Sequence, residues 1–98
     1  MIKVLQKRRV KKSNFPQVMV HLNDLRSAAI RQPGYVTGET LIRGSDPRDV
    51  MTIATWISED HWNAWTTSEE RIELNDIING LIDGDVEISI YEVPTGEE

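Results

Sequence analysis

The order of apolar and polar residues predicts strands at both ends of the chain. Residues 2–10 (IKVLQKRRV) and 85–93 (DVEISIYEV) alternate between the two classes, as expected of strands with one face toward a core. Residues 35–43 (YVTGETLIR) and 49–57 (DVMTIATWI) are rich in β-branched residues, which favour extended backbone. The polar residues 44–48 (GSDPR) between them predict a hairpin turn.

The first amphipathic helix is predicted after the first strand. Ser13 or Asn14 can cap it, and Pro16 can occupy its first turn without loss of a needed donor. Pro33 and Gly34 are expected to end it. Its apolar stripe has the spacing of three and four residues typical of a helix, and comprises Phe15, Val18, Leu22, Leu25 and Ala29.

A second helix is predicted before the last strand. Ser58 can cap a short helical turn that precedes it. Thr67 and Glu70 have the spacing of a capping box, which indicates that the longer helix begins there. Asn79 and Gly80 have low helix propensity and weaken the C-terminal end of this helix. The apolar stripe of this second helix comprises Leu74, Ile77, Ile78 and Leu81.

The predicted order is βαββαβ, which is typical of an α+β, ferredoxin-like fold in which an antiparallel sheet carries two helices on one face. The strands are apolar on both faces. Val50, Ala54 and Trp56 alternate with Met51 and Ile53 along residues 49–57. Two helices cannot cover both faces, and an uncovered apolar sheet face usually marks an interface. We therefore expect a homodimer whose open sheet faces pack together.

Composition supports a single soluble domain over residues 1–98, with residues 95–98 as a frayed tail. The chain has no cysteine, which suits a reducing cytoplasm, and no segment apolar enough to span a membrane. Residues 1–12 carry +6 and the remainder −11. An acidic chain repels nucleic acid, so we expect no nucleic-acid partner, and Asp85 and Glu87 are predicted to pair with Lys7 and Arg9 across neighbouring strands.

All three tryptophans lie within ten residues, in TWISEDHWNAW (55–65). Trp62 and Trp65 are three residues apart and share one side of a helical turn, while Trp56 ends the preceding strand. Two interpretations follow. The cluster clamps the turn against the sheet, with each ring burying ~150–250 Å², or its rings line a pocket that takes a flat aromatic ligand.

Polar candidates for the same pocket are fewer. His61 in its neutral form could accept a proton from a substrate hydroxyl. Asn75 could hydrogen-bond a ligand oxygen, and Tyr35 and Thr40 could project into the pocket from their strand. A solvated surface position is the more ordinary explanation for His61 and Asn75, and ordinary sheet packing explains Tyr35 and Thr40 equally well. The two histidines and the scattered acids lack the spacing of metal ligands, so we expect no metal site.

Three segments resemble the antibiotic biosynthesis monooxygenase family: QPGYVTGETL (32–41), TWIS (55–58) and HWNAWTTSEE (61–70). The resemblance spans nearly the whole chain. It implies a ferredoxin-like homodimer that forms a shared α/β-barrel. Members of the family oxidise quinols or polycyclic aromatics without metal or cofactor, degrade haem, isomerise small phosphorylated signals, or have no known activity.

The haem-degrading branch can be compared residue by residue. Its tryptophan corresponds to Trp65, but the position of its iron-ligating histidine is occupied by Asn75. Its strand asparagine corresponds to Gln6 or Lys7. A carboxamide is a poor iron ligand, so haem degradation is not expected.

The resemblance and the residues together favour a cofactor-independent monooxygenase that acts on an electron-rich phenol or quinol. In this reading Trp56, Trp62 and Trp65 bind the aromatic substrate, His61 accepts the proton, and no cofactor takes part. The alternative is a non-catalytic module, either a small-molecule binder or a structural dimer, in which the tryptophans only pack.

Overall fold

The structure is a computed structural model, which describes residues 1–94. The predicted tail at 95–98 lies outside the described residues. Four strands, three α-helices and a 3-10 turn follow one another as β1 (Ile2–Val10), η1 (Lys12–Asn14), α1 (Phe15–Ile30), β2 (Tyr35–Arg43), β3 (Asp46–Trp56), α2 (Glu59–Thr66), α3 (Glu69–Asn79) and β4 (Ile82–Glu92).

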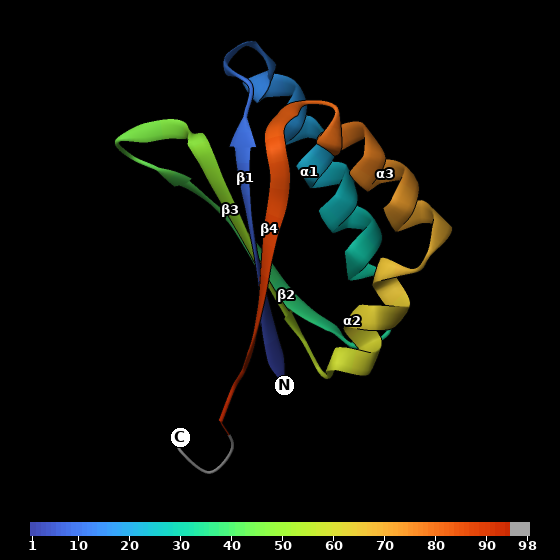
Figure 1. Ribbon diagram of the computed structural model, residues 1–98. Helices are drawn as coiled ribbons and strands as arrows, with labels where there is room; N and C mark the ends of the chain where they lie inside the picture. Colours follow the sequence, from blue (N-terminus) through green and yellow to red (C-terminus); the bar gives the residue numbers. More distant parts are fainter. Residues whose placement is uncertain (95–98) are drawn as a thin grey trace.

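The strands form one antiparallel sheet in the order β2-β3-β1-β4. The three helices pack on one side of this sheet, and its other side is open (Figure 1). This arrangement confirms the predicted ferredoxin-like fold. Since the two central strands β1 and β3 carry side chains under the helices, the residues that alternate inward along them determine what the protein holds in its interior.

Two strands begin earlier than the sequence indicated. The turn between β2 and β3 is only Gly44-Ser45, because Arg43 pairs with Asp46, so the predicted turn 44–48 was too long. β4 begins at Ile82 rather than Asp85. It contains two extra residues between Asp83 and Glu87 relative to β1, and Gly84 there has φ +72. Such a bulge breaks the alternation on which the prediction depended.

The cap of the last helix also differs from the prediction. Ser68, not Thr67, precedes α3 and accepts a hydrogen bond from the backbone N–H of Arg71. The Thr67 hydroxyl instead donates to carbonyl oxygens of α2. Ser58 caps α2 as predicted. Within the predicted stripe, Ile78 is fully buried but Ile77 is exposed, since one helix face cannot hold two consecutive residues equally.

The core fills the layer between helices and sheet. Two layers that meet on their apolar faces are expected to bury one contiguous cluster. Its largest member is Trp56, at the end of β3, which has no exposed surface. The other buried apolar residues are Ile2, Val4, Val10, Val18, Leu22, Leu25, Ala28, Ala29, Val50, Trp62, Trp65, Ile78 and Ile82.

Charged side chains at the strand ends pair differently from the prediction. Lys7 lies opposite Glu87 as expected, but Arg9 lies opposite Asp83, and its guanidinium contacts Asp46 of β3. The β4 bulge causes this shift, because it displaces Asp85 from the register. Within residues 1–94, no helix is both long and apolar enough to cross a membrane.

Candidate functional site

A cavity of about 60 Å³ lies between the helices and the sheet. Its walls come from five elements, because α1 and α2 pack there against the three strands β1, β2 and β3. The lining residues are Gln6 of β1, Leu22, Leu25, Arg26 and Ala29 of α1, Tyr35, Gly38, Glu39 and Thr40 of β2, Thr52, Ile53, Ala54 and Trp56 of β3, and Trp62 and Trp65 of α2.

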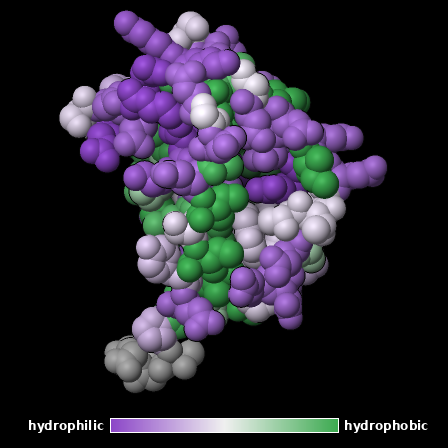
Figure 2. Space-filling view, viewed as in Figure 1, coloured by the Kyte–Doolittle hydropathy of each residue, from purple (hydrophilic) through white to green (hydrophobic). Residues whose placement is uncertain are grey.

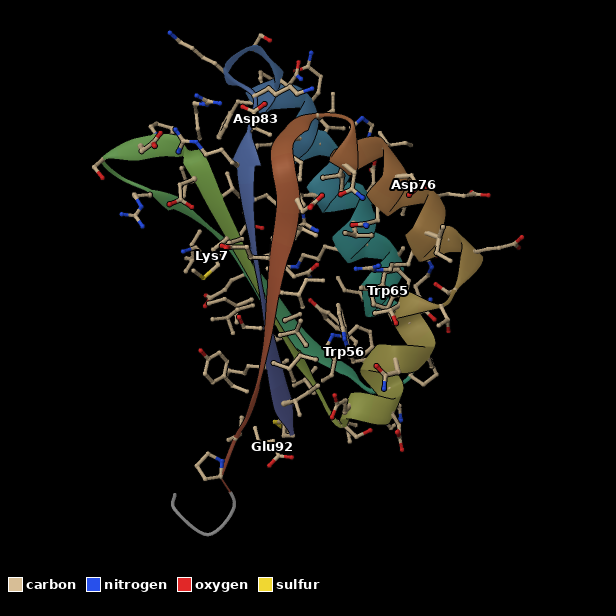
Figure 3. The ribbon with its side chains drawn as sticks, in the orientation of Figure 1. Lys7, Trp56, Trp65, Asp76, Asp83 and Glu92 are labelled. Carbon is tan, nitrogen blue, oxygen red and sulfur yellow. The ribbon has the colours of Figure 1, made fainter. Side chains whose placement is uncertain are left out.

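The three tryptophans form one aromatic cluster at this cavity. Trp56 and Trp65 point into the layer between sheet and helices from opposite sides (Figure 3), with ring centroids 6.4 Å apart and planes inclined by 27°. Trp62 meets Trp56 edge-on at 6.1 Å. Both geometries are favourable for aromatic pairs. The buried indole N–H of Trp56 has no hydrogen-bond partner among the described residues.

Tyr35 and Thr40 lie at the β2 side of the cavity. The Tyr35 ring packs edge-on against Trp56 at 5.4 Å. A side chain at Gly38 would clash with the Tyr35 hydroxyl, at 2.5 Å from the added carbon, so glycine leaves room for that hydroxyl. Thr40, Thr52 and Gln6 lie opposite one another on adjacent strands, and they form a polar row across the sheet under the helices.

His61 is not among the lining residues. Its Nδ1 lies 2.7 Å from the Ser58 hydroxyl oxygen, which also accepts the His61 backbone N–H. A hydroxyl that accepts one bond can donate another, so Ser58 can donate to Nδ1 and leave the ring proton on Nε2. The imidazole covers Gly34, where φ is +86 and an added carbon would meet the ring at 2.3 Å. Glycine is therefore required there.

A buried polar cluster lies beside the cavity, between β1 and α3. Arg8 extends inward from β1, where it donates to Gln6 at 3.2 Å, Thr52 at 3.4 Å and the side-chain oxygen of Asn75 at 3.5 Å. One helical turn before Asn75, Arg71 lies over the Trp62 ring, 5.5 Å from its centroid. Asn75 therefore contacts an arginine rather than the cavity.

Both arginines are poorly accommodated by their surroundings. Burial and, to a smaller extent, the nearby positive charge of Arg71 together lower the pKa of Arg8 to about 10. Burial also lowers the pKa of Arg71. In both cases the low-dielectric interior disfavours the cation. Each Nε atom is buried without a hydrogen-bond partner among residues 1–94.

The sequence interpretation missed these two residues. It treated Arg8 as part of a basic surface segment, although Ile2, Val4 and Val10 alternate with it on one side of the strand. The two-residue period of a strand, applied strictly, would have predicted that the Arg8 side chain points inward. Arg71 and Asn75 are four residues apart and therefore neighbours on one helix face, and this spacing was the available signal for Arg71. Within the described part of the chain, no three histidine or acidic side chains cluster as metal ligands would.

Comparison with solved structures agrees with this fold. A conserved protein from Methanosarcina mazei Go1 superposes with a TM-score of 0.87 at 20% identity, covering 92% of this chain and 89% of its own. An antibiotic biosynthesis monooxygenase gives 0.87 at 17%, covering 96% and 99%. The N63A mutant of SnoaB, a cofactor-independent oxygenase from Streptomyces nogalater, gives 0.88 at 15%, covering 99% and 97%.

The sequence itself supplies the family. No curated protein matches the chain. The model of the family described as antibiotic biosynthesis monooxygenase matches residues 1–74, which include the cavity walls contributed by β1, α1, β2, β3 and α2. The protein therefore belongs to the antibiotic biosynthesis monooxygenase family.

Proposed function

We propose that this protein is a cofactor-independent monooxygenase that oxidises an electron-rich aromatic compound, such as a phenol or quinol, in the cavity between sheet and helices. The observation that carries the proposal is the wall formed by Trp56, Trp62 and Trp65. Flat rings offer stacking surfaces for a flat substrate, and pockets for such ligands are mostly apolar with few polar groups.

The chemistry needs only the substrate and O₂. A ring methylene beside a phenol is oxidised to a carbonyl: one oxygen atom enters the substrate, and the other leaves as water with both hydrogens of the methylene. The substrate supplies all four electrons. Loss of the phenolic proton makes it electron-rich enough to transfer the first of them, so the protein contributes orientation, exclusion of water and stabilisation of the anion.

His61 remains the candidate proton acceptor, and its surroundings make the role demanding. The ring lies over Gly34 and outside the cavity lining, and Ser58 occupies its Nδ1. It must turn toward the cavity to act. His61→Gln tests this role, because glutamine can still hydrogen-bond Ser58 but cannot accept the proton. Oxygen uptake at the wild-type rate in this variant would exclude His61 as the acceptor.

The proposed function is tested first by titration of tryptophan fluorescence with hydroquinones and tricyclic anthrones. We expect saturable quenching, because all three tryptophans line the cavity. Oxygen uptake with the compound that binds best then tests catalysis. Trp65→Leu should weaken binding while the circular dichroism spectrum stays native. Quenching without oxygen uptake across the panel would contradict a monooxygenase.

We further propose that the protein acts as a homodimer, in the cytoplasm. The sheet face opposite the helices carries Leu5, Met51 and Ile53 on its central strands, and Lys7 projects from that side (Figure 3). Tyr91 of β4 lies opposite Lys3 and adds an exposed aromatic ring to the open face. An apolar stripe follows the line of β4 at the sheet edge (Figure 2), where Ile88 and Ile90, opposite Gln6 and Val4, are exposed beside the helical layer. A second copy would cover these surfaces.

Sedimentation velocity tests the dimer. Met51 lies opposite Lys7 on the open face, so Met51→Lys adds a like charge at the centre of the proposed interface and should yield monomers. Ile72→Lys is the matched control, since Ile72 is an exposed apolar residue of α3, on the helical side of the molecule. A wild-type protein that sediments as a monomer would contradict the proposal.

One observation favours the alternative, a non-catalytic module. The cavity is small in the isolated chain, about 60 Å³, whereas pockets for drug-sized ligands measure ~300–1,000 Å³. A substrate would have to displace Arg26 or Tyr35, or the second copy would have to extend the walls. Flat fluorescence traces with every aromatic compound would favour packing as the role of the tryptophans.

A further inference from the structure

The interior contains two cations that face no anion. The exposed surface of Arg8 is 2% and that of Arg71 is 9%. Five ion pairs occur within residues 1–94, and none includes either residue. A buried charge without a partner is strongly unfavourable, and here each cation also repels the other. The unligated fold therefore lacks a negative charge beside Arg8 and Arg71.

The contacts of the two side chains leave donors available. Arg8 reaches only neutral oxygens, at 3.2–3.5 Å, which is long compared with the ~2.7–2.9 Å of a guanidinium bound to an anionic oxygen. The Arg71 side chain forms no hydrogen bond to residues 1–94, and its guanidinium lies over the face of Trp62. A guanidinium has five donors in a planar fork, so the pair has capacity for an anionic ligand.

The position of the pair connects it to the aromatic cavity. Gln6 and Thr52, which hold the Arg8 guanidinium, both line the cavity. Trp62 lines it with its ring, and Arg71 lies against that ring. Each cation therefore lies directly behind residues of the cavity lining, Arg8 behind Gln6 and Thr52 and Arg71 behind Trp62. Rotation of the Gln6 carboxamide, which a single 3.2 Å hydrogen bond holds in place, would open the cavity toward Arg8.

We infer that Arg8 and Arg71 form an anion site, which binds the negatively charged oxygen of an aromatic ligand whose ring lies against Trp56 and Trp62. This inference rests on the proposed aromatic pocket and specifies its ligand as an aryl carboxylate or an ionised phenol. In the phenol case, the two cations favour loss of the phenolic proton. The pair then supplies the driving force for ionisation, and the phenolic proton passes to water, so that no base needs to lie in the cavity.

Calorimetric titration with 2-naphthoate and its neutral analogue 2-naphthamide tests the carboxylate. We expect naphthoate to bind at least about tenfold more tightly, because a hydrogen bond to a charged group contributes more than a neutral one. Arg71→Met should remove this preference and leave the naphthamide affinity unchanged. The variant breaks no side-chain hydrogen bond within residues 1–94, so it should fold.

A second titration tests the phenol. Binding of 4-nitrophenol to the site should raise its nitrophenolate absorbance at a pH below its own pKa, and Arg71→Met should abolish the rise. A preference for naphthoate alone identifies an aryl carboxylate as the ligand class, and the absorbance rise alone identifies a phenolate. Absence of both effects in the wild-type protein would overturn the anion site.

Two control variants fix the location. Arg31→Met removes an exposed arginine that pairs with Glu70 and should leave both affinities unchanged. Arg26→Met removes the exposed arginine of the cavity lining. Loss of the naphthoate preference in Arg26→Met but not in Arg71→Met would move the anion to the rim and overturn the assignment.

The failure of this inference can be distinguished from that of the proposed function. Equal binding of naphthoate and naphthamide, together with saturable quenching by hydroquinones, would refute the anion site and retain the aromatic pocket. The anion site also has a readout that needs no aromatic pocket. Sodium acetate should raise the melting temperature of the wild type more than sodium chloride at equal ionic strength, and Arg71→Met should lose that difference.

Discussion

Six of the seven arginines of this protein fall into two groups with opposite surroundings, and the seventh, Arg26, is exposed and forms no ion pair within residues 1–94. Four arginines at the surface, three of them exposed and Arg48 half-buried, each contact a carboxylate: Arg9 with Asp46, Arg31 with Glu70, Arg43 with Asp49 and Arg48 with Asp83. Two buried arginines, Arg8 and Arg71, contact none within residues 1–94. Ion pairs have little effect on stability at the surface, whereas a buried cation needs a partner. A sequence selected for stability alone would distribute its acids in the reverse way.

The aromatic cluster is the second half of this comparison. It occupies the same layer as the buried arginines, but its rings satisfy one another by packing. Within this cluster, the Trp56 indole N–H is the one fully buried polar group that has no hydrogen-bond partner among residues 1–94. The interior therefore has one end stabilised by the chain itself and one end that requires a ligand. Four substitutions test this difference, in order of decreasing effect.

Trp56→Ala should have the largest effect. Trp56 is fully buried and contacts Tyr35, Trp62 and Trp65. Removal of its ring leaves a large cavity at the end of β3 and should lower the free energy of unfolding by about 3–5 kcal/mol. Urea denaturation followed by circular dichroism measures the loss. A decrease below about 1 kcal/mol would show that the aromatic end does not hold the layer together.

Arg71→Met should act in the opposite direction. Relief of the buried charge favours the fold by ~1–4 kcal/mol, and loss of the contact with Trp62 costs ~0.5–2 kcal/mol. We therefore expect the unligated protein to become more stable by about 1–2 kcal/mol, as is common when a functional residue is removed. Urea denaturation without added anion measures it. Destabilisation of the variant would identify Arg71 as a structural residue.

Ser68→Ala should have a smaller effect. The Ser68 hydroxyl accepts the backbone N–H of Arg71 at the start of α3, so its removal should cost about 1 kcal/mol. Thr67→Ala is the matched control, because the Thr67 hydroxyl donates to α2 and does not cap α3. Thermal denaturation of both variants gives the comparison. Equal losses would show that Ser68 is not the effective cap.

Arg31→Met should have the smallest effect. Its pair with Glu70 is exposed, with 61% and 49% of the two side chains accessible, and such pairs contribute ~0–1 kcal/mol. The same urea experiment should give a change within this range. A larger loss would mean that the surface pairs stabilise the fold, and it would weaken the contrast between the two groups of arginines.

Much of the fold was predictable from the sequence because each element has a local signal. The alternation in residues 2–10 gave β1 with its observed ends, and the stripe from Phe15 to Ala29 gave α1, which ends at Ile30, before the predicted stop at Pro33 and Gly34. Errors occurred where the local signal was ambiguous. Thr67 and Ser68 are adjacent and can both cap a helix, and the bulge at Gly84 disrupts the alternation of β4.

The candidate site was predictable only in part. Trp56, Trp62, Trp65, Tyr35 and Thr40 all line the cavity, because large aromatic residues and strand residues near them tend to reach the core. His61 and Asn75 lie outside its lining. Their side-chain direction depends on how α2 and α3 rotate against the sheet, and composition carries no information about that rotation.

The sequence by itself determined the order of strands and helices, the family and the concentration of tryptophans at one end of the sheet, since each of these depends on residues close together in the chain. Only the tertiary structure decided that Arg8 and Arg71, 63 positions apart, lie in one buried cluster. The interaction of one side chain with another depends on their distance in space and on the water excluded between them. Both quantities exist only after β1 and α3 have packed together.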